Sequence, residues 1–105
     1  MFIGATNVVS DYSKNAVTIW LHFLGLGVGF EFANPPKEGL VETFNQLRKE
    51  GRVTDFRFTE PSDCQKYYWV SFEVPMPEGG PPTVEEGALE SVKELSQLVD
   101  SYFAA

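Results

Sequence analysis

The side chains best suited to chemistry in this chain are its one histidine, His22, and its one cysteine, Cys64. A histidine can act as a general base near neutral pH, and a cysteine thiolate can act as a nucleophile. His22 lies in an apolar run with no serine, cysteine or acidic motif beside it. Cys64 lies in a polar turn near Lys66, but the contexts typical of papain-like and thioredoxin-like enzymes are absent. We therefore expect a structural histidine and an incidental thiol, and we assign no catalytic residue.

The same two residues bear on metal binding. One histidine and one cysteine cannot supply the soft ligands of a zinc site. A calcium loop needs spaced Asp or Asn residues with a glycine among them, and the sequence contains no such loop. We predict no metal site and no cofactor.

Three glycines alternate with apolar residues in Gly25-Leu26-Gly27-Val28-Gly29. A dinucleotide-binding loop needs the spacing G-x-G-x-x-G before a helix, and a Walker loop needs a following Lys-Ser or Lys-Thr. Neither is present, because Phe30-Glu31-Phe32 continues the run as a strand-like alternation. We favour a hairpin that turns at residues 25–27, between strands over 16–24 and 28–32. The alternative is one long strand whose glycines share a face, so that a helix backbone or a partner can approach closely.

Aromatic residues are concentrated in residues 67–74, the most informative stretch of the chain. In a strand, side chains alternate between the two faces of the sheet. One face of this strand suits a core, with Tyr68, Val70, Phe72 and Val74. The opposite face carries Tyr67 and Trp69, and the strand predicted over 53–60 adds Arg57 to that face.

If both predicted helices cover one face of the sheet, Tyr67 and Trp69 stand on the open face. Trp20 joins them in one of the two phases that its own strand can take. Aromatic side chains on an uncovered sheet form the kind of apolar patch that marks an interface. The alternative is that a loop or the N-terminal hairpin covers them. We interpret Tyr67, Trp69, Arg57 and Trp20 as candidate partner-binding residues.

A second candidate surface is acidic. Glu86, Glu90 and Glu94 recur at intervals of four residues on the last predicted helix. Such residues share a face, and their like charges repel slightly. They form either a solvated surface or a docking stripe for a basic protein, which would speed association more than it raises affinity.

Two segments rich in proline and glycine, residues 34–36 and 75–82, divide the predicted elements. The elements are strands over 7–10 and 16–24, a helix over 37–52, strands over 53–60 and 66–74, and a helix over about 83–103, which opens with the capping box of Thr83 and Glu86. Residues 9–23 also fit a helical stripe, although the β-branched cluster at 17–20 favours a strand. The first helix should bury Leu40, Val41, Phe44 and Leu47.

This order of elements predicts an α+β fold. We expect an antiparallel sheet of four to five strands with two helices packed on one face, in the ferredoxin-like or split βαβ style. The chain has 105 residues, which suits a single domain over residues 1–105.

The whole chain is acidic, with eight Lys or Arg residues against fifteen Asp or Glu and a net charge of −7. This surplus disfavours direct nucleic-acid binding and binding to anionic membranes. The apolar run over 16–30 is shorter than the roughly 20 residues of a spanning helix, so we expect no membrane segment. A single cysteine forms no intrachain disulfide and fits a cytoplasmic protein.

Together these features favour a non-enzymatic, acidic protein-interaction domain, such as a small inhibitor, immunity protein or regulator. It would dock a protein partner, basic if the acidic helix takes part, through the open aromatic face, that helix or both. The alternative is a homodimer whose sheets form a pocket for a small molecule, as a sensor or a minimal enzyme. A structural subunit of a larger assembly is the third interpretation.

Overall fold

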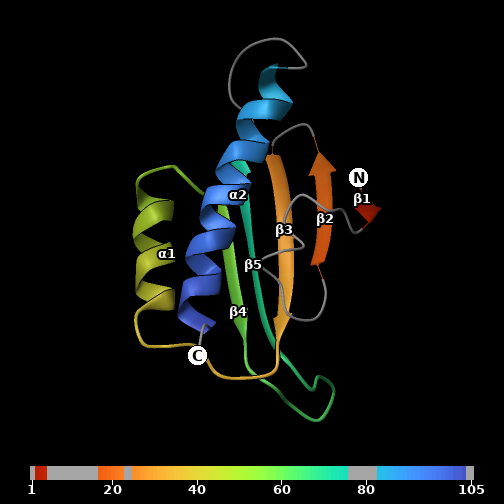
Figure 1. Cartoon of the computed structure of the whole chain (residues 1–105), viewed down its shortest axis with the longest axis vertical. Coiled ribbons are helices and arrows are strands. Elements are labelled where there is room, and N and C mark those ends of the chain that lie inside the picture. The colour runs from red at the N-terminus through yellow and green to blue at the C-terminus, as the bar shows by residue number, and fades with distance from the viewer. Residues whose placement is uncertain (1, 5–16, 23–24, 76–82, 104–105) are drawn as a thin grey trace.

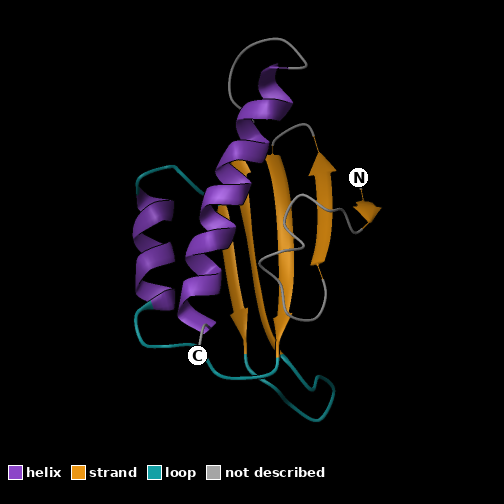
Figure 2. Ribbon diagram, viewed as in Figure 1, coloured by secondary structure: helices purple, strands orange, loops and turns teal. Residues whose placement is uncertain are grey.

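The computed structural model describes residues 2–4, 17–22, 25–75 and 83–103, with side chains for 18–19, 25–75 and 89–103. Its elements are β1 (Phe2–Gly4), β2 (Val17–His22), β3 (Gly25–Phe32), α1 (Leu40–Lys49), β4 (Asp55–Thr59), β5 (Tyr68–Pro75) and α2 (Thr83–Phe103) (Figure 1). The described strands form one antiparallel sheet in the order β1-β2-β3-β5-β4. Both helices lie on one face of that sheet (Figure 2). The predicted α+β architecture is confirmed.

One side of the sheet is a split β-α-β unit made of β3, α1 and β4. β5 pairs antiparallel with both β3 and β4, so it lies between them and the two outer strands of the unit run parallel. Ferredoxin-like sheets are built on the same unit. On the other side of β3 the neighbouring strand is β2, which precedes β3 in the chain. The topology is therefore compatible with the ferredoxin-like style.

An apolar core lies between the sheet and the helices. Alternation along β3 and β5 puts Val28, Phe30, Val70 and Phe72 on the helix side, each no more than 1% exposed. The register pairs Val28 with Phe72 and Phe30 with Val70. Aromatic and β-branched side chains that face each other in this way stabilise neighbouring strands. The predicted core face of β5 is thus confirmed.

Helix α2 begins at Thr83 and ends at Phe103, as predicted. Val92, Leu95 and Val99 follow helical spacing and are buried over β3 and β5. The ring of Phe103 stacks on that of Phe32, with their centroids 3.8 Å apart. This contact fixes the C-terminal end of α2 above β3.

Within the described residues, neither helix has an apolar stretch of the length that crosses a lipid bilayer.

Helix α1 is shorter than predicted, because it covers Leu40–Lys49 and not residues 37–52. Gly39, directly before it, has a φ of 101°, and Gly51, just after it, has a φ of 80°. Both angles lie in the left-handed region that glycine adopts most easily, and they end the helical path on either side.

The predicted burial of Val41 is wrong, since its side chain is 37% exposed. Leu40, Phe44 and Leu47 form the buried stripe of α1. Successive residues lie about 100° apart around a helix, so Val41 falls at the edge of a stripe that is set by Leu40 and Phe44. The exposed side chain of Val41 lines a groove at the start of α1.

The predicted strand over 16–24 is confirmed as β2, and the helical alternative is wrong. β2 and β3 pair antiparallel from His22 opposite Gly25, so the predicted hairpin connection is present. Its turn does not lie at residues 25–27, because these residues belong to β3. The strand predicted over 7–10 lies outside the described residues.

Candidate functional site

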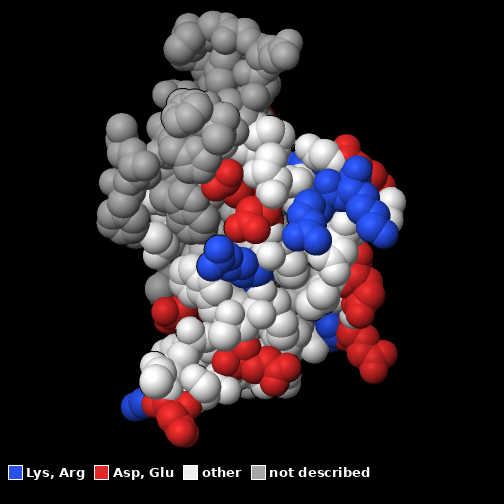
Figure 3. Space-filling view, turned by 180° about the vertical axis from the view of Figure 1, so that it is seen from behind, with Lys and Arg blue, Asp and Glu red and all other residues white. Residues whose placement is uncertain are grey.

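The face of the sheet away from α1 and α2, here called the rear face, is seen in Figure 3. Strand alternation decides which residues belong to it. Its described residues are Gly25, Gly27, Gly29 and Glu31 of β3, Trp69, Ser71 and Glu73 of β5, and Asp55, Arg57 and Thr59 of β4. The fold thus places Trp69 and Arg57 on one surface, as expected from the sequence.

The indole of Trp69 lies against the backbone of β3. A Cβ atom at Gly29 would overlap Cζ2 and Cη2 of that ring, so the glycine makes room for it. The glycines therefore share one face of a strand, and the group that approaches closely is a side chain from the neighbouring strand. Trp69 is partly buried, and Ser71 next to Gly29 is 5% exposed. The centre of the rear face is consequently less open than the sequence suggested.

The accessible part of the rear face lies at β4. Tyr67 was expected on this face, but it lies in a bend before β5, so strand alternation does not assign its side chain to either face. Tyr67 is 40% exposed, and its carbonyl oxygen accepts a hydrogen bond of 2.8 Å from Nε2 of Gln65. The side chain of Arg57 is 75% exposed, and its Nε lies 3.6 Å from Oδ2 of Asp55. A surface ion pair of this kind contributes little to stability, so a partner can compete for the guanidinium group at small cost.

Acidic and basic side chains are mixed on the rear face in Figure 3. Glu73 belongs to this surface, and its Oε1 accepts a hydrogen bond of 3.2 Å from Oγ1 of Thr54. Among the described residues that strand alternation assigns to this face, Glu31, Asp55 and Glu73 are acidic and Arg57 is basic. The described part of the face is therefore more negative than positive.

Three residues singled out in the sequence have side chains outside the described part: Trp20, His22 and Glu86. The backbone register places Trp20 opposite Gly27, in the row of the rear-face glycines. Cys64 is exposed in the turn between β4 and β5. Among the described residues, no group of three or more His, Cys, Asp or Glu side chains is placed to hold a metal ion.

The acidic stripe on α2 is weaker than the sequence suggested. Glu90 is exposed, but Oε1 of Glu94 accepts a hydrogen bond of 3.1 Å from Nη2 of Arg52. That bond offsets one of the stripe's charges. Moreover, α2 lies on the opposite side of the sheet from Trp69, so the acidic helix and the rear face are two separate surfaces.

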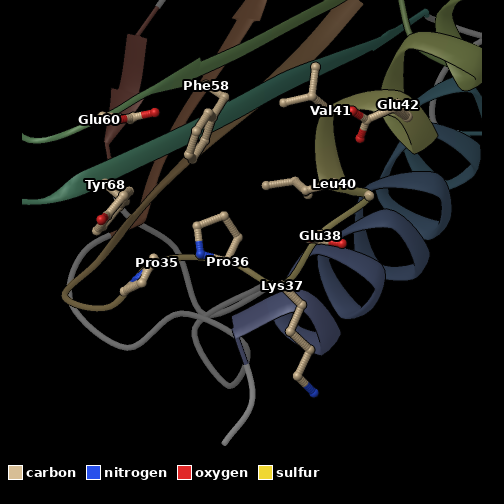
Figure 4. Close-up of a pocket in the computed structure, with 11 residues that line it drawn as sticks. Pro35, Pro36, Lys37, Glu38, Leu40, Val41, Glu42, Phe58, Glu60 and Tyr68 are labelled. Carbon is tan, nitrogen blue, oxygen red and sulfur yellow. The ribbon is translucent and has the colours of Figure 1, made fainter.

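A groove at the N-terminal end of α1, here called the α1 groove, was not found from the sequence (Figure 4). It has a volume of about 310 Å³ and lies between the proline segment before α1 and the facing ends of β4 and β5. Its apolar lining consists of Pro35, Pro36, Leu40, Val41, Phe58 and Tyr68. Its charged lining consists of Glu38, Glu42, Glu60 and Lys37. These residues come from distant parts of the chain, so sequence spacing carries no signal for the groove.

Comparison of the chain with protein-family models, with curated proteins and with solved structures gives no match.

The two surfaces are chemically different. The rear face offers an ordered indole and an exposed guanidinium group, which suits contact with another protein. The α1 groove is small, open and edged with carboxylates, which suits a single cationic side chain better than a cofactor.

Proposed function

We propose that this chain is a non-enzymatic, acidic protein-interaction domain that binds a protein partner through its rear face. The observation that supports the proposal is the packing of Trp69 on Gly29, on the same face as the exposed side chain of Arg57. Tyr67, which is 40% exposed, comes directly before the strand that carries Trp69. Tyrosine, tryptophan and arginine are the residues most enriched in interface hot spots. Because the indole is already ordered, binding would cost little side-chain entropy.

Such a domain would act by occupying a surface of its partner, in the manner of a small inhibitor, immunity protein or regulator. The net charge of −7 supports a basic partner, since long-range attraction speeds the encounter of opposite charges. Glu90, exposed on α2, would contribute to that attraction without touching the partner at the rear face.

Loss of either aromatic side chain, Tyr67 or Trp69, should weaken capture of the protein partner. The wild-type domain and the variants Tyr67→Ala and Trp69→Ala are used side by side for affinity capture from native lysate. Each variant should weaken binding about ten-fold or more, which corresponds to about 1.4 kcal/mol. Both should stay folded, because neither residue belongs to the buried core cluster. Retained proteins are identified by mass spectrometry, and folding is checked by urea unfolding.

Lys93→Ala serves as the control, since Lys93 is an exposed cationic residue on α2 and far from the rear face. Proteins that wild type and control retain, and that both aromatic variants lose, would support the proposal. Equal retention by all four proteins would refute it. Light scattering of the purified domain at micromolar concentration separates a monomer, which the proposal requires, from the alternative homodimer.

A further inference from the structure

The floor of the α1 groove is apolar and partly exposed. The rings of Phe58 and Tyr68 are nearly parallel, with centroids 6.1 Å apart and an interplanar angle of 16°. In Figure 4 the side chains of Phe58, Leu40 and Val41 point toward a common space, and Val41 is 37% exposed. Concave apolar surface that water can reach is typical of a binding site.

The rim of the same groove is negative. Glu38 and Glu42 stand at the start of α1, and Glu60 follows β4. Within the described part of the chain, none of the three forms an ion pair. Lys37 also lines the groove, but its side chain points away from the aromatic floor in Figure 4. The N-terminus of α1 adds only about half a positive charge, so the rim stays negative.

We infer that the α1 groove binds the side chain of one arginine on a basic segment of a partner protein. The planar guanidinium group can stack on the ring of Phe58 or Tyr68 and donate hydrogen bonds to the rim carboxylates. Its aliphatic stem would pack on the exposed side chain of Val41, which lines the groove. Lysine lacks the planar group and fits less well, and an acidic or phosphorylated segment would be repelled.

This site is separate from the rear face. Phe58 and Tyr68 lie on the helix side of the sheet, whereas Trp69 and Arg57 lie on the rear face. Binding of arginine in the α1 groove can therefore be tested without the partner proposed above, and either proposal can fail while the other holds.

The test is an NMR titration of the isotope-labelled full chain with the blocked peptide acetyl-Gly-Arg-Gly-amide. The side-chain signals of Leu40, Val41, Phe58 and Tyr68 should shift together as the peptide is added. The matched peptide with citrulline, which keeps the planar shape but has no charge, should bind at least ten-fold more weakly. The lysine peptide should also bind more weakly than the arginine peptide.

Two sets of variants test the rim. The triple variant E38Q/E42Q/E60Q should weaken binding of the arginine peptide at least ten-fold. The control triple variant E50Q/D63N/E90Q removes the same number of charges at exposed positions outside the groove and should change binding less than two-fold. W69A should leave binding unchanged, because Trp69 does not line the groove.

Three results would overturn the inference. Equal binding of the citrulline or lysine peptide would show that the groove does not select a guanidinium group. Equal weakening by the two triple variants would show that net charge alone attracts the peptide. Signals that shift at the rear face and not in the groove would place the arginine elsewhere.

Discussion

At the scale of single residues, Gly29 and Trp69 explain why the glycine-rich strand exists. The sequence shows glycines in a strand-like alternation, a pattern that usually weakens a strand. The structure shows that Gly29 provides the space in which the Trp69 ring lies. The absence of a side chain at Gly29 therefore allows the Trp69 ring to pack on the backbone of β3.

This pairing predicts a specific coupling in stability. Gly29→Ala should lower the free energy of unfolding by about 1–3 kcal/mol, because the new Cβ overlaps the indole ring. In the Trp69→Ala background the same substitution should cost much less, since the ring is gone. A double-mutant cycle measured by urea unfolding gives the coupling energy. Additive effects of the two substitutions would contradict the close packing.

At the scale of elements, two hydrogen bonds of Tyr102 join α2 to α1 and to the segment just before α1. The hydroxyl groups of Thr43 and Tyr102 are 2.7 Å apart, and the backbone N–H of Lys37 donates to the carbonyl oxygen of Tyr102 at 2.7 Å. Tyr102 also lies near Gly39, in the turn before α1. These contacts hold the start of α1, and with it the rim of the α1 groove, against the second helix.

Removal of the Tyr102 hydroxyl should loosen this junction. Tyr102→Phe should lower the free energy of unfolding by about 0.5–1.5 kcal/mol, the net contribution of a typical hydrogen bond. Tyr67→Phe is the matched control, because Tyr67 is exposed and removal of its hydroxyl should change stability little. Both values come from urea unfolding. If the two variants are equally stable, the hydrogen bond between the helices contributes nothing.

At the scale of the whole molecule, charge and shape act separately. The chain has a net charge of −7, yet the rear face carries both signs and the α1 groove carries mainly carboxylates. The net negative charge attracts a basic partner toward the domain over a long range, while local contacts decide where the partner binds.

Because this long-range attraction is electrostatic, the association rate of the captured partner should depend on salt concentration. Glu90→Gln should slow association by less than about two-fold at low salt, because one charge about 10 Å away in water contributes only about 0.4 kcal/mol and Glu90, across the sheet from the rear face, lies farther from the partner. The difference should disappear at 1 M salt, where the screening length is about 3 Å. Glu94→Gln should have a similar effect, since it also removes one negative charge and the charge of Arg52 is unchanged. Stopped-flow measurements across salt concentrations test this, and a difference that persists at high salt would show direct contact at Glu90.

The sequence by itself determined the elements whose pattern is local. The period of two along 68–74 identified β5 and its core face, because strand side chains alternate wherever the strand is placed. The capping box at Thr83 and the apolar spacing after it identified α2 at both ends. The one-sided arrangement of helices followed from the order of elements, since a sheet with one apolar face must be covered on that face.

Only the tertiary structure decided the features that join distant segments. The role of Gly29 depends on Trp69, which is forty residues away in the sequence. The exposure of Val41 depends on the direction from which the sheet meets α1. The α1 groove combines Pro36 with Phe58 and Tyr68, and the register of β4 on β5 brings those two aromatic rings together. The spacing of residues within one helix or strand does not reveal such contacts, because their energy depends on how different elements pack together.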